Sequence, residues 1–350
     1  MVSLHSLFAN ASPSSNFTMK KIFISLFIFS FFTSAVFAQT NSQVRKRIDG
    51  TDRNVNPENL SNSQLNNKRQ NKTASKDSGA QRPVILSKTG ISSFFGYDSK
   101  YFYRSNPLAT DGPAKQQATG MWTNTFYSGA GLGVFDLTDS VVTPYIGASW
   151  TINEYVKSDL ESFNYNSTNA YALLLFQLGN GWAFRVGSSY ANDRSANFDT
   201  EDYKEFFPSI AAMRTFSVSD EISATFDLSF GKHIAESFVM DVTDSKGNQS
   251  DKMELSNFDT SASISLVYYF GDALITPKYR ISFKSYDKGL NKNREDFSHD
   301  LGVKLDYPIT EAFKASLFYS YSTRSSDGTD ISYDYKSYDA GLGLGLNARF

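Results

Sequence analysis

The last thirteen residues, YDAGLGLGLNARF at positions 338–350, decide the fold class. Tyr338, Leu344 and Phe350 fall on one face of an extended chain together with the other apolar residues of the stretch. Asp339 and the intervening glycines fall on the opposite face. A period of two is typical of a β-strand with one apolar face and one polar or small face.

The same alternation recurs upstream. It predicts twelve strands, at residues 91–104, 121–136, 142–156, 167–178, 182–193, 203–217, 221–236, 257–270, 273–286, 297–307, 312–325 and 335–350. Most of these segments exceed the roughly 5–6 residues of an ordinary globular strand. They also reach the length of about 9–11 residues that crosses a bilayer at a tilt. Because the first segment alternates least regularly, ten or fourteen strands remain alternatives.

The connections between these segments are short and long in turn. Short turns are expected at 137–140, 179–181, 218–221, 271–272 and 308–311, and longer polar loops near 157–166, 194–202, 237–256, 287–296 and 325–334. Short turns at one end and longer loops at the other are the hairpin pattern of a membrane-spanning barrel, with the turns on the periplasmic side. A chain that begins and ends on that side needs an even number of strands.

The composition limits the chemistry. The chain has 350 residues, no Cys, three His, 15% aromatic residues and a formal net charge of −2. The lack of Cys excludes a disulfide scaffold and a thiolate nucleophile or metal ligand. So few His residues make a His-based metal cluster improbable, and the near-neutral charge argues against a nucleic-acid-binding surface. We therefore expect no metal, no cofactor and no nucleic-acid partner.

The N-terminal region predicts a secretory signal. Met19 is followed by two lysines, an apolar run of 11 residues at 22–32 and a small-residue cleavage site after Ala38. That run is too short for a transmembrane helix, which needs about 20 residues. We interpret Met19 as the true start and 1–38 as upstream residues plus a cleaved signal peptide.

A polar linker is expected to follow. Residues 39–89 contain ten basic and four acidic residues and few apolar ones, a composition typical of a disordered segment. Residues 90–350 contain 22 basic and 32 acidic residues and form the predicted barrel. The basic linker is interpreted as a passive spacer, with a plug of the barrel or a contact to anionic partners as alternatives.

The polar faces of the predicted strands carry many charges, which a soluble β-sandwich or lipocalin-like core would have to bury without obvious partners. In a membrane barrel these faces line a wet lumen and the apolar faces meet lipid. The candidate selectivity residues are Lys278, Arg280, Lys284, Lys304, Lys314, Arg324, Asp227 and Asp306.

With this terminal strand closing on Phe350, the chain resembles Gram-negative outer-membrane β-barrel proteins of the porin-like class, over about residues 90–350. The resemblance implies an all-β, antiparallel up-and-down transmembrane barrel in the outer membrane. It also implies outer-membrane lipid and lipopolysaccharide as surroundings, and the barrel-assembly machinery as a partner that reads Phe350 as its signal.

Three functions follow as hypotheses. The first is a porin-like channel for small polar or anionic solutes, because fixed charges along a pore set its selectivity. The second is a plugged structural barrel, or one whose loops bind a partner or surface. The third and least favoured is a lipid-modifying enzyme, because neither His233 nor His299 has a Ser two residues away on its own face. We therefore predict that the protein is not an enzyme.

Overall fold

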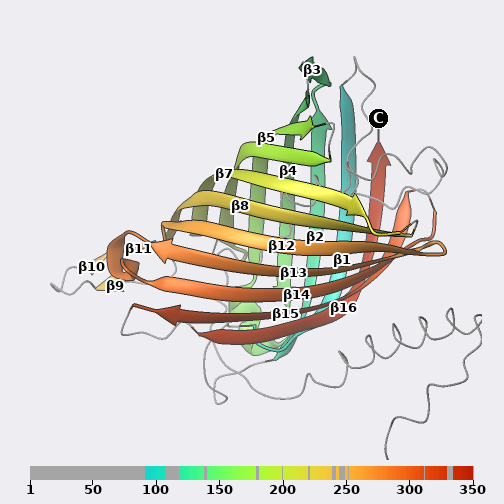
Figure 1. Cartoon of the computed structure of the whole chain (residues 1–350). Coiled ribbons are helices and arrows are strands. Elements are labelled where there is room, and N and C mark those ends of the chain that lie inside the picture. Colours follow the sequence, from blue (N-terminus) through green and yellow to red (C-terminus); the bar gives the residue numbers. More distant parts are fainter. Residues whose placement is uncertain are drawn as a thin grey trace, which may run out of the picture. The chain divides into compact units, whose positions relative to one another are not determined.

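The computed structural model describes residues 91–107, 118–137, 140–178, 181–198, 200–219, 221–238, 242–243, 249–250, 252–310, 312–328 and 334–349. Twelve long antiparallel strands form a closed barrel (Figure 1). They are β1 (Ser92–Arg104), β2 (Thr119–Gly131), β4 (Ser140–Tyr155), β5 (Tyr165–Leu178), β6 (Trp182–Ser195), β7 (Glu201–Ser217), β8 (Ile222–Ser237), β12 (Asn257–Phe270), β13 (Ala273–Tyr286), β14 (Glu295–Pro308), β15 (Phe313–Asp327) and β16 (Tyr335–Arg349).

The barrel closes between its first and last strands. β1 pairs with β2 on one side and with β16 on the other, from Phe94 opposite Arg349 to Arg104 opposite Asp339. Every other long strand pairs with its neighbours along the chain, so the sheet has no free edge. Closure satisfies the backbone polar groups that lipid cannot hydrogen-bond. The predicted all-β barrel of twelve strands is confirmed, including the weakly alternating first strand.

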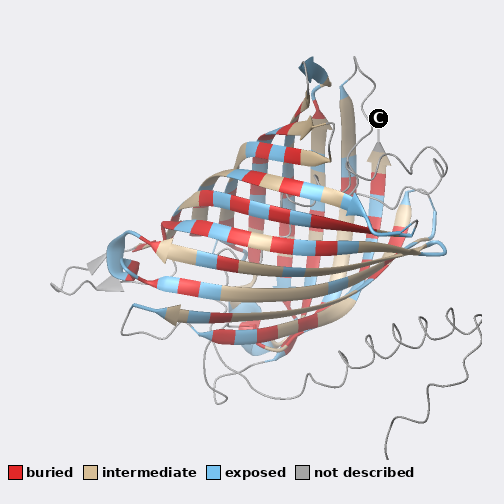
Figure 2. Ribbon diagram, in the orientation of Figure 1, coloured by how far each residue is buried: buried red, intermediate tan, exposed pale blue. Residues whose placement is uncertain are grey.

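On most of the long strands, alternation of buried and exposed residues separates an outer from an inner surface (Figure 2). Along the middle of the strands, exposed side chains on the outer surface are apolar, both aliphatic, as at Leu228 and Ile264, and aromatic, as at Phe126 and Tyr279. Aromatic side chains lie exposed nearer the strand ends: Tyr103, Trp122 and Trp150 toward the loops, and Phe95, Phe184, Phe216, Phe270 and Tyr307 toward the turns. An apolar band between two aromatic girdles is the lipid-facing surface of a transmembrane barrel.

The longer loops hold short elements of their own. These are η4 (Ser158–Phe163), β9 (Val242–Thr243), β10 (Gln249–Ser250), β11 (Met253–Glu254) and η5 (Gly289–Asn291). Two apolar clusters pack at this end of the barrel. One consists of Leu160 of η4 with Phe102, Met121, Tyr155 and Tyr165, and the other of Met253 and Leu255 with Tyr203, Ala235 and Tyr286. The loop end is therefore folded and partly apolar.

One predicted strand is interrupted. The segment expected at 121–136 is continuous only to Gly131, and β3 (Phe135–Leu137) pairs separately with β4. Gly133 has φ of 104°, a left-handed conformation that favours glycine and breaks the extended chain.

Several predictions concern residues outside the described ranges. They are the signal peptide with Met19 and Ala38, the linker 39–89, and the terminal Phe350. Among the described residues, no helix has the length and apolar character needed to cross a membrane.

Candidate functional site: the charged lumen

The eight predicted lumen residues all lie on strand faces that point inward, but they do not form one wall. Asp227, Lys304, Asp306 and Lys314 lie in the half of the barrel nearer the short turns. Lys278 and Arg280 lie near the middle of β13, and Lys284 and Arg324 lie toward the loops. Each region also contains carboxylates, so the structure divides the lumen charge into separate clusters.

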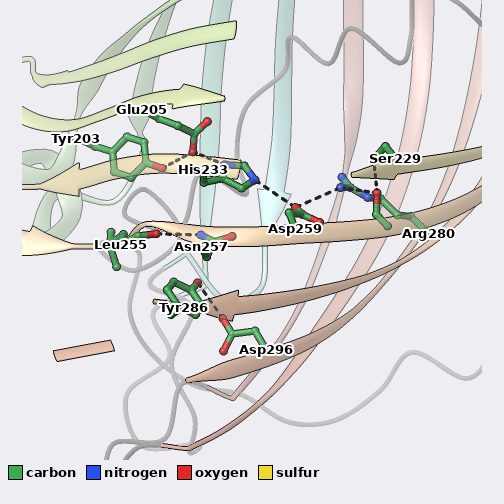
Figure 3. Close-up of polar contacts among 11 residues, drawn as sticks. Tyr203, Glu205, Ser229, His233, Leu255, Asn257, Asp259, Arg280, Tyr286 and Asp296 are labelled. Carbon is green, nitrogen blue, oxygen red and sulfur yellow. Dashed lines mark hydrogen bonds and ion pairs between the residues drawn. The ribbon is translucent and has the colours of Figure 1, made fainter. Parts of the chain in front are cut away.

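The first cluster, toward the loop end, is a row of side chains from four neighbouring strands, centred on His233 (Figure 3). His233 Nδ1 lies 2.9 Å from Glu205 Oε2, and His233 Nε2 lies 3.3 Å from Asp259 Oδ2. Tyr203 Oη donates to the same Glu205 oxygen at 2.5 Å. On the far side of Asp259, an Arg280 nitrogen lies 3.7 Å from the carboxylate. The row alternates acidic and basic groups across β7, β8, β12 and β13.

Local packing positions His233. The ring of Phe207 stacks on the imidazole at a centroid distance of 4.0 Å and an interplanar angle of 18°. That ring occupies the space over Gly231, where an added Cβ would lie 2.4 Å from Phe207. Glycine at 231 therefore makes room for the ring that orients His233. The β7–β8 pairing is interrupted beside this contact, at Pro208, whose nitrogen carries no hydrogen to donate.

A second cluster closes the loop end around Asp296, whose side chain is fully buried. Arg294 donates to this carboxylate through Nε at 2.7 Å and Nη2 at 2.5 Å. Tyr286 Oη donates at 3.1 Å and Ser326 Oγ at 2.7 Å, and Arg324 lies 3.7 Å away. One carboxylate thus ties the β13–β14 loop to β13, β14 and β15.

At the same end of the barrel, an ion pair joins β1 and β16, the two strands between which the barrel closes. Arg104 of β1 donates from Nε and Nη2 to the Asp339 carboxylate of β16, the shortest of these bonds being 2.8 Å. A two-nitrogen contact of this kind is among the stronger charged hydrogen bonds in proteins.

The third cluster lies on β14, β15, β16 and β1 in the turn half. Lys304 pairs with Asp306 at 2.9 Å, and Ser316 donates to the same aspartate at 2.5 Å. Lys314 and Lys100 lie within electrostatic reach of Lys304, which brings three ammonium groups to one part of the wall. We call Lys100, Lys304 and Lys314 the lysine cluster.

Glycines on the inner face of β16 make this cluster possible. An added Cβ at Gly345 would lie 2.7 Å from Lys314 Cε and 2.5 Å from an Asp98 oxygen. An added Cβ at Gly343 would lie 3.2 Å from Lys100 Cγ. The alternating glycines of the terminal strand leave a shallow trough, and side chains of the two neighbouring strands lie across it.

The turn half of the lumen also contains a buried ion pair and an apolar cluster. Arg185 and Asp227 lie 3.9 Å apart with both side chains almost inaccessible. The inward-facing apolar residues near them are Tyr145, Tyr171, Leu173, Leu175, Ala183 and Met213. Alternation alone predicts polar residues at these positions, and the inward face of β5 departs from that pattern.

Sequence reasoning missed several charged residues of these clusters. Lys100 lies on the strand with the least regular alternation, so its face was not assigned. Arg294 belongs to a loop, for which periodicity gives no direction. Arg185 and Glu205 could have been predicted to face the lumen, because both lie on the polar face of a predicted strand.

The two described histidines differ in their surroundings. Over the described residues, the hydrogen bonds of His233 go to the two carboxylates and none goes to a serine hydroxyl. His299 lies on the outer surface, where Nδ1 is 2.7 Å from Tyr279 Oη. A serine hydroxyl hydrogen-bonded to imidazole therefore does not occur at either described histidine. Within the same ranges, no group of three or more metal-ligating side chains converges.

The combination that decides the class is a closed antiparallel barrel with a lipid-facing apolar band outside and charged clusters inside. The chain is an outer-membrane β-barrel. Its location is accordingly the bacterial outer membrane. No family model and no curated protein matches the sequence.

Solved structures with a similar fold are outer-membrane barrels. An outer-membrane channel from Pseudomonas putida F1 is 8% identical with a TM-score of 0.44, over 75% of this chain and 97% of that chain. The translocator domain of the autotransporter NalP from Neisseria meningitidis is 12% identical with a TM-score of 0.41, over 75% and 90%. A KdgM porin in complex with disordered oligogalacturonate is 13% identical with a TM-score of 0.37, over 71% and 97%. Likeness at this level does not identify a solute.

Proposed function

We propose that this outer-membrane barrel is a porin-like channel for small polar or anionic solutes. The observation that carries the proposal is the chemistry of the inner wall, on which hydroxyl, amide and charged side chains predominate. Eight strands enclose little more than their own side chains, and the interior widens with strand number, so twelve strands leave more room along the axis. Lysines on that wall favour anions over cations.

The loop end supports a second candidate, a barrel closed at rest. Asp296 and Arg294 are fully buried, and Leu160 of η4 is 1% exposed. Loops held in this way narrow the entrance. A closed barrel would have a structural role or would bind a partner through its loops, and the lumen charges would then serve mainly as internal ion pairs.

Swelling of proteoliposomes that contain the full chain distinguishes the two candidates. A channel admits a small neutral sugar, and admits an anionic sugar acid of similar size faster than the matching amino sugar. Liposomes with folded protein that swell no faster than protein-free liposomes would contradict the channel and support the closed barrel. Asp296→Ala, which releases the loop end, serves as a second sample and is expected to swell faster than wild type.

The remaining assignments belong to the same proposal. The protein is not an enzyme, and lipopolysaccharide and the barrel-assembly machinery are its expected partners in the envelope. The linker at 39–89 is proposed as a spacer on the periplasmic side. Deleting it leaves permeability unchanged if it is a spacer and raises permeability if it plugs the lumen.

A further inference from the structure

We propose that the lysine cluster of Lys100, Lys304 and Lys314 is a binding site for one small oxyanion, a carboxylate or a phosphate group. The inference rests on the proposed channel only in that the anion must reach the lumen. It goes further by assigning the place and the groups that hold the anion.

Strand register brings the three lysines together from strands far apart in the sequence. One row of paired residues crosses β14, β15, β16 and β1. In this row Asp306 is paired with Ser316, Ser316 with Gly343, and Gly343 with Lys100. In the adjacent row, Lys314 lies opposite Gly345, and Gly345 lies opposite Asp98. Lys304 is two residues from Asp306 on the same face of β14. The three lysines therefore share one small area of the wall.

The charges in this area do not balance. Three lysines face two aspartates, Asp98 and Asp306, and Asp306 is already engaged by Lys304 at 2.9 Å. Lys314 is 6% exposed; within the described ranges its ammonium group makes no hydrogen bond or close ion pair, and the carboxylate that acts on it, Asp306, is already engaged by Lys304. Two buried ammonium groups that share one carboxylate are incompletely compensated, and an anion bound beside them reduces that penalty.

The lysine stems are held in place by the surrounding residues. The trough over Gly343 and Gly345 accommodates the aliphatic parts of Lys100 and Lys314. In the next row toward the loops, the rings of Phe102 and Phe318 meet edge to face with centroids 5.6 Å apart. Lys304 lies opposite Phe318 in this row, so the aromatic pair lies beside Lys304 and on the loop side of Lys100 and Lys314. The three donors are thus arranged before an anion arrives, which reduces the ordering cost of binding.

The donor set favours an oxyanion over a halide. Each ammonium donates directed hydrogen bonds, and a carboxylate or phosphate offers several acceptor oxygens to more than one lysine. Such a group can be a free inorganic ion or the acidic group of a larger solute. In both cases the site recognises the negatively charged acceptor oxygens.

Phosphate binding to the full chain in detergent micelles tests the inference. Phosphate is titrated and followed by ³¹P line broadening, acetate forms a second arm, and chloride is the competitor. We expect saturable phosphate binding by wild type, at least tenfold weaker binding by Lys314→Gln, and near-wild-type binding by Lys314→Arg. The factor follows because a hydrogen bond to a charged group is worth at least the free energy of a tenfold change in affinity.

Lys284→Gln is the matched control, because Lys284 also faces the lumen but lies beside Asp259 and outside the cluster. Gel migration without boiling confirms that every variant is folded. Wild type without saturable binding, or Lys314→Gln with wild-type affinity, would overturn the site. Swelling of liposomes with neutral sugar is measured on the same samples, so loss of the binding site and loss of the channel are separate results.

Discussion

Removing the Asp296 carboxylate tests whether the loop end is held by one buried charge. Asp296→Ala leaves Arg294 buried with no acceptor for two guanidinium hydrogen bonds, and also removes the acceptor of Tyr286 and Ser326. Breaking a buried pair by removing one partner costs about 3–5 kcal/mol. Arg324, 3.7 Å from the carboxylate, loses its nearby counter-charge as well.

We therefore expect Asp296→Ala to lower the free energy of unfolding by about 4 kcal/mol, close to a thousandfold in the folding equilibrium. Asp296→Asn keeps the shape and one acceptor oxygen and is expected to cost about half as much. The assay is urea unfolding of the full chain refolded into lipid vesicles, followed by tryptophan fluorescence.

Glu295→Gln is the control, because this neighbouring carboxylate is exposed and its removal should change stability by less than about 0.5 kcal/mol. If Asp296→Ala lowers the free energy of unfolding by less than about 1 kcal/mol, and the dependence of that free energy on urea concentration is unchanged, the reasoning is refuted. Such a result would mean that water or another group satisfies Arg294 once the carboxylate is gone.

Three further predictions concern other parts of the chain. Gly341→Ala places a Cβ 2.3 Å from both the Phe102 side chain and the Tyr101 backbone oxygen, so we expect at least about 2 kcal/mol of destabilisation in the same urea assay. Gly302→Ala is the control and should be tolerated, because the nearest atom to its added Cβ would be 3.9 Å away. Equal losses of stability in the two variants would contradict the packing described for Gly341. Leu228→Arg puts a charge in the lipid-facing band and should cost about 2–4 kcal/mol in vesicles; a cost near zero would argue that this surface does not meet the membrane core. N-terminal sequencing of protein from the outer-membrane fraction should begin one residue after Ala38, and a start upstream of it would disprove the predicted cleavage.

Strand number and lumen face were predictable because they depend on local periodicity. A residue two positions along a strand faces the same way, so the polar faces carrying Lys304 and Lys314 are visible in the sequence. The first strand, whose alternation is weak, was also predicted, because a chain that begins and ends on the periplasmic side needs an even number of strands. The interruption at Gly133 was not predicted, because alternation continues across a residue whose backbone turns left-handed.

Which charges meet was not predictable to the same extent. Contacts such as Arg104 with Asp339 join residues from opposite ends of the chain, and they depend on the register at which the barrel closes. Loop residues such as Arg294 carry no periodic signal at all. The predicted lumen cations are therefore distributed over several clusters, each of which contains carboxylates.

Single-channel recording of the full chain in a planar bilayer tests the central claim most directly. Under a KCl gradient, the account predicts a steady conductance with a reversal potential on the anion-selective side. Lys304→Gln with Lys314→Gln should move that potential toward cation selectivity, whereas Lys284→Gln should move it less. Folded, inserted protein with no conductance would contradict the channel, and a conductance whose selectivity ignores the lysine cluster would contradict its role.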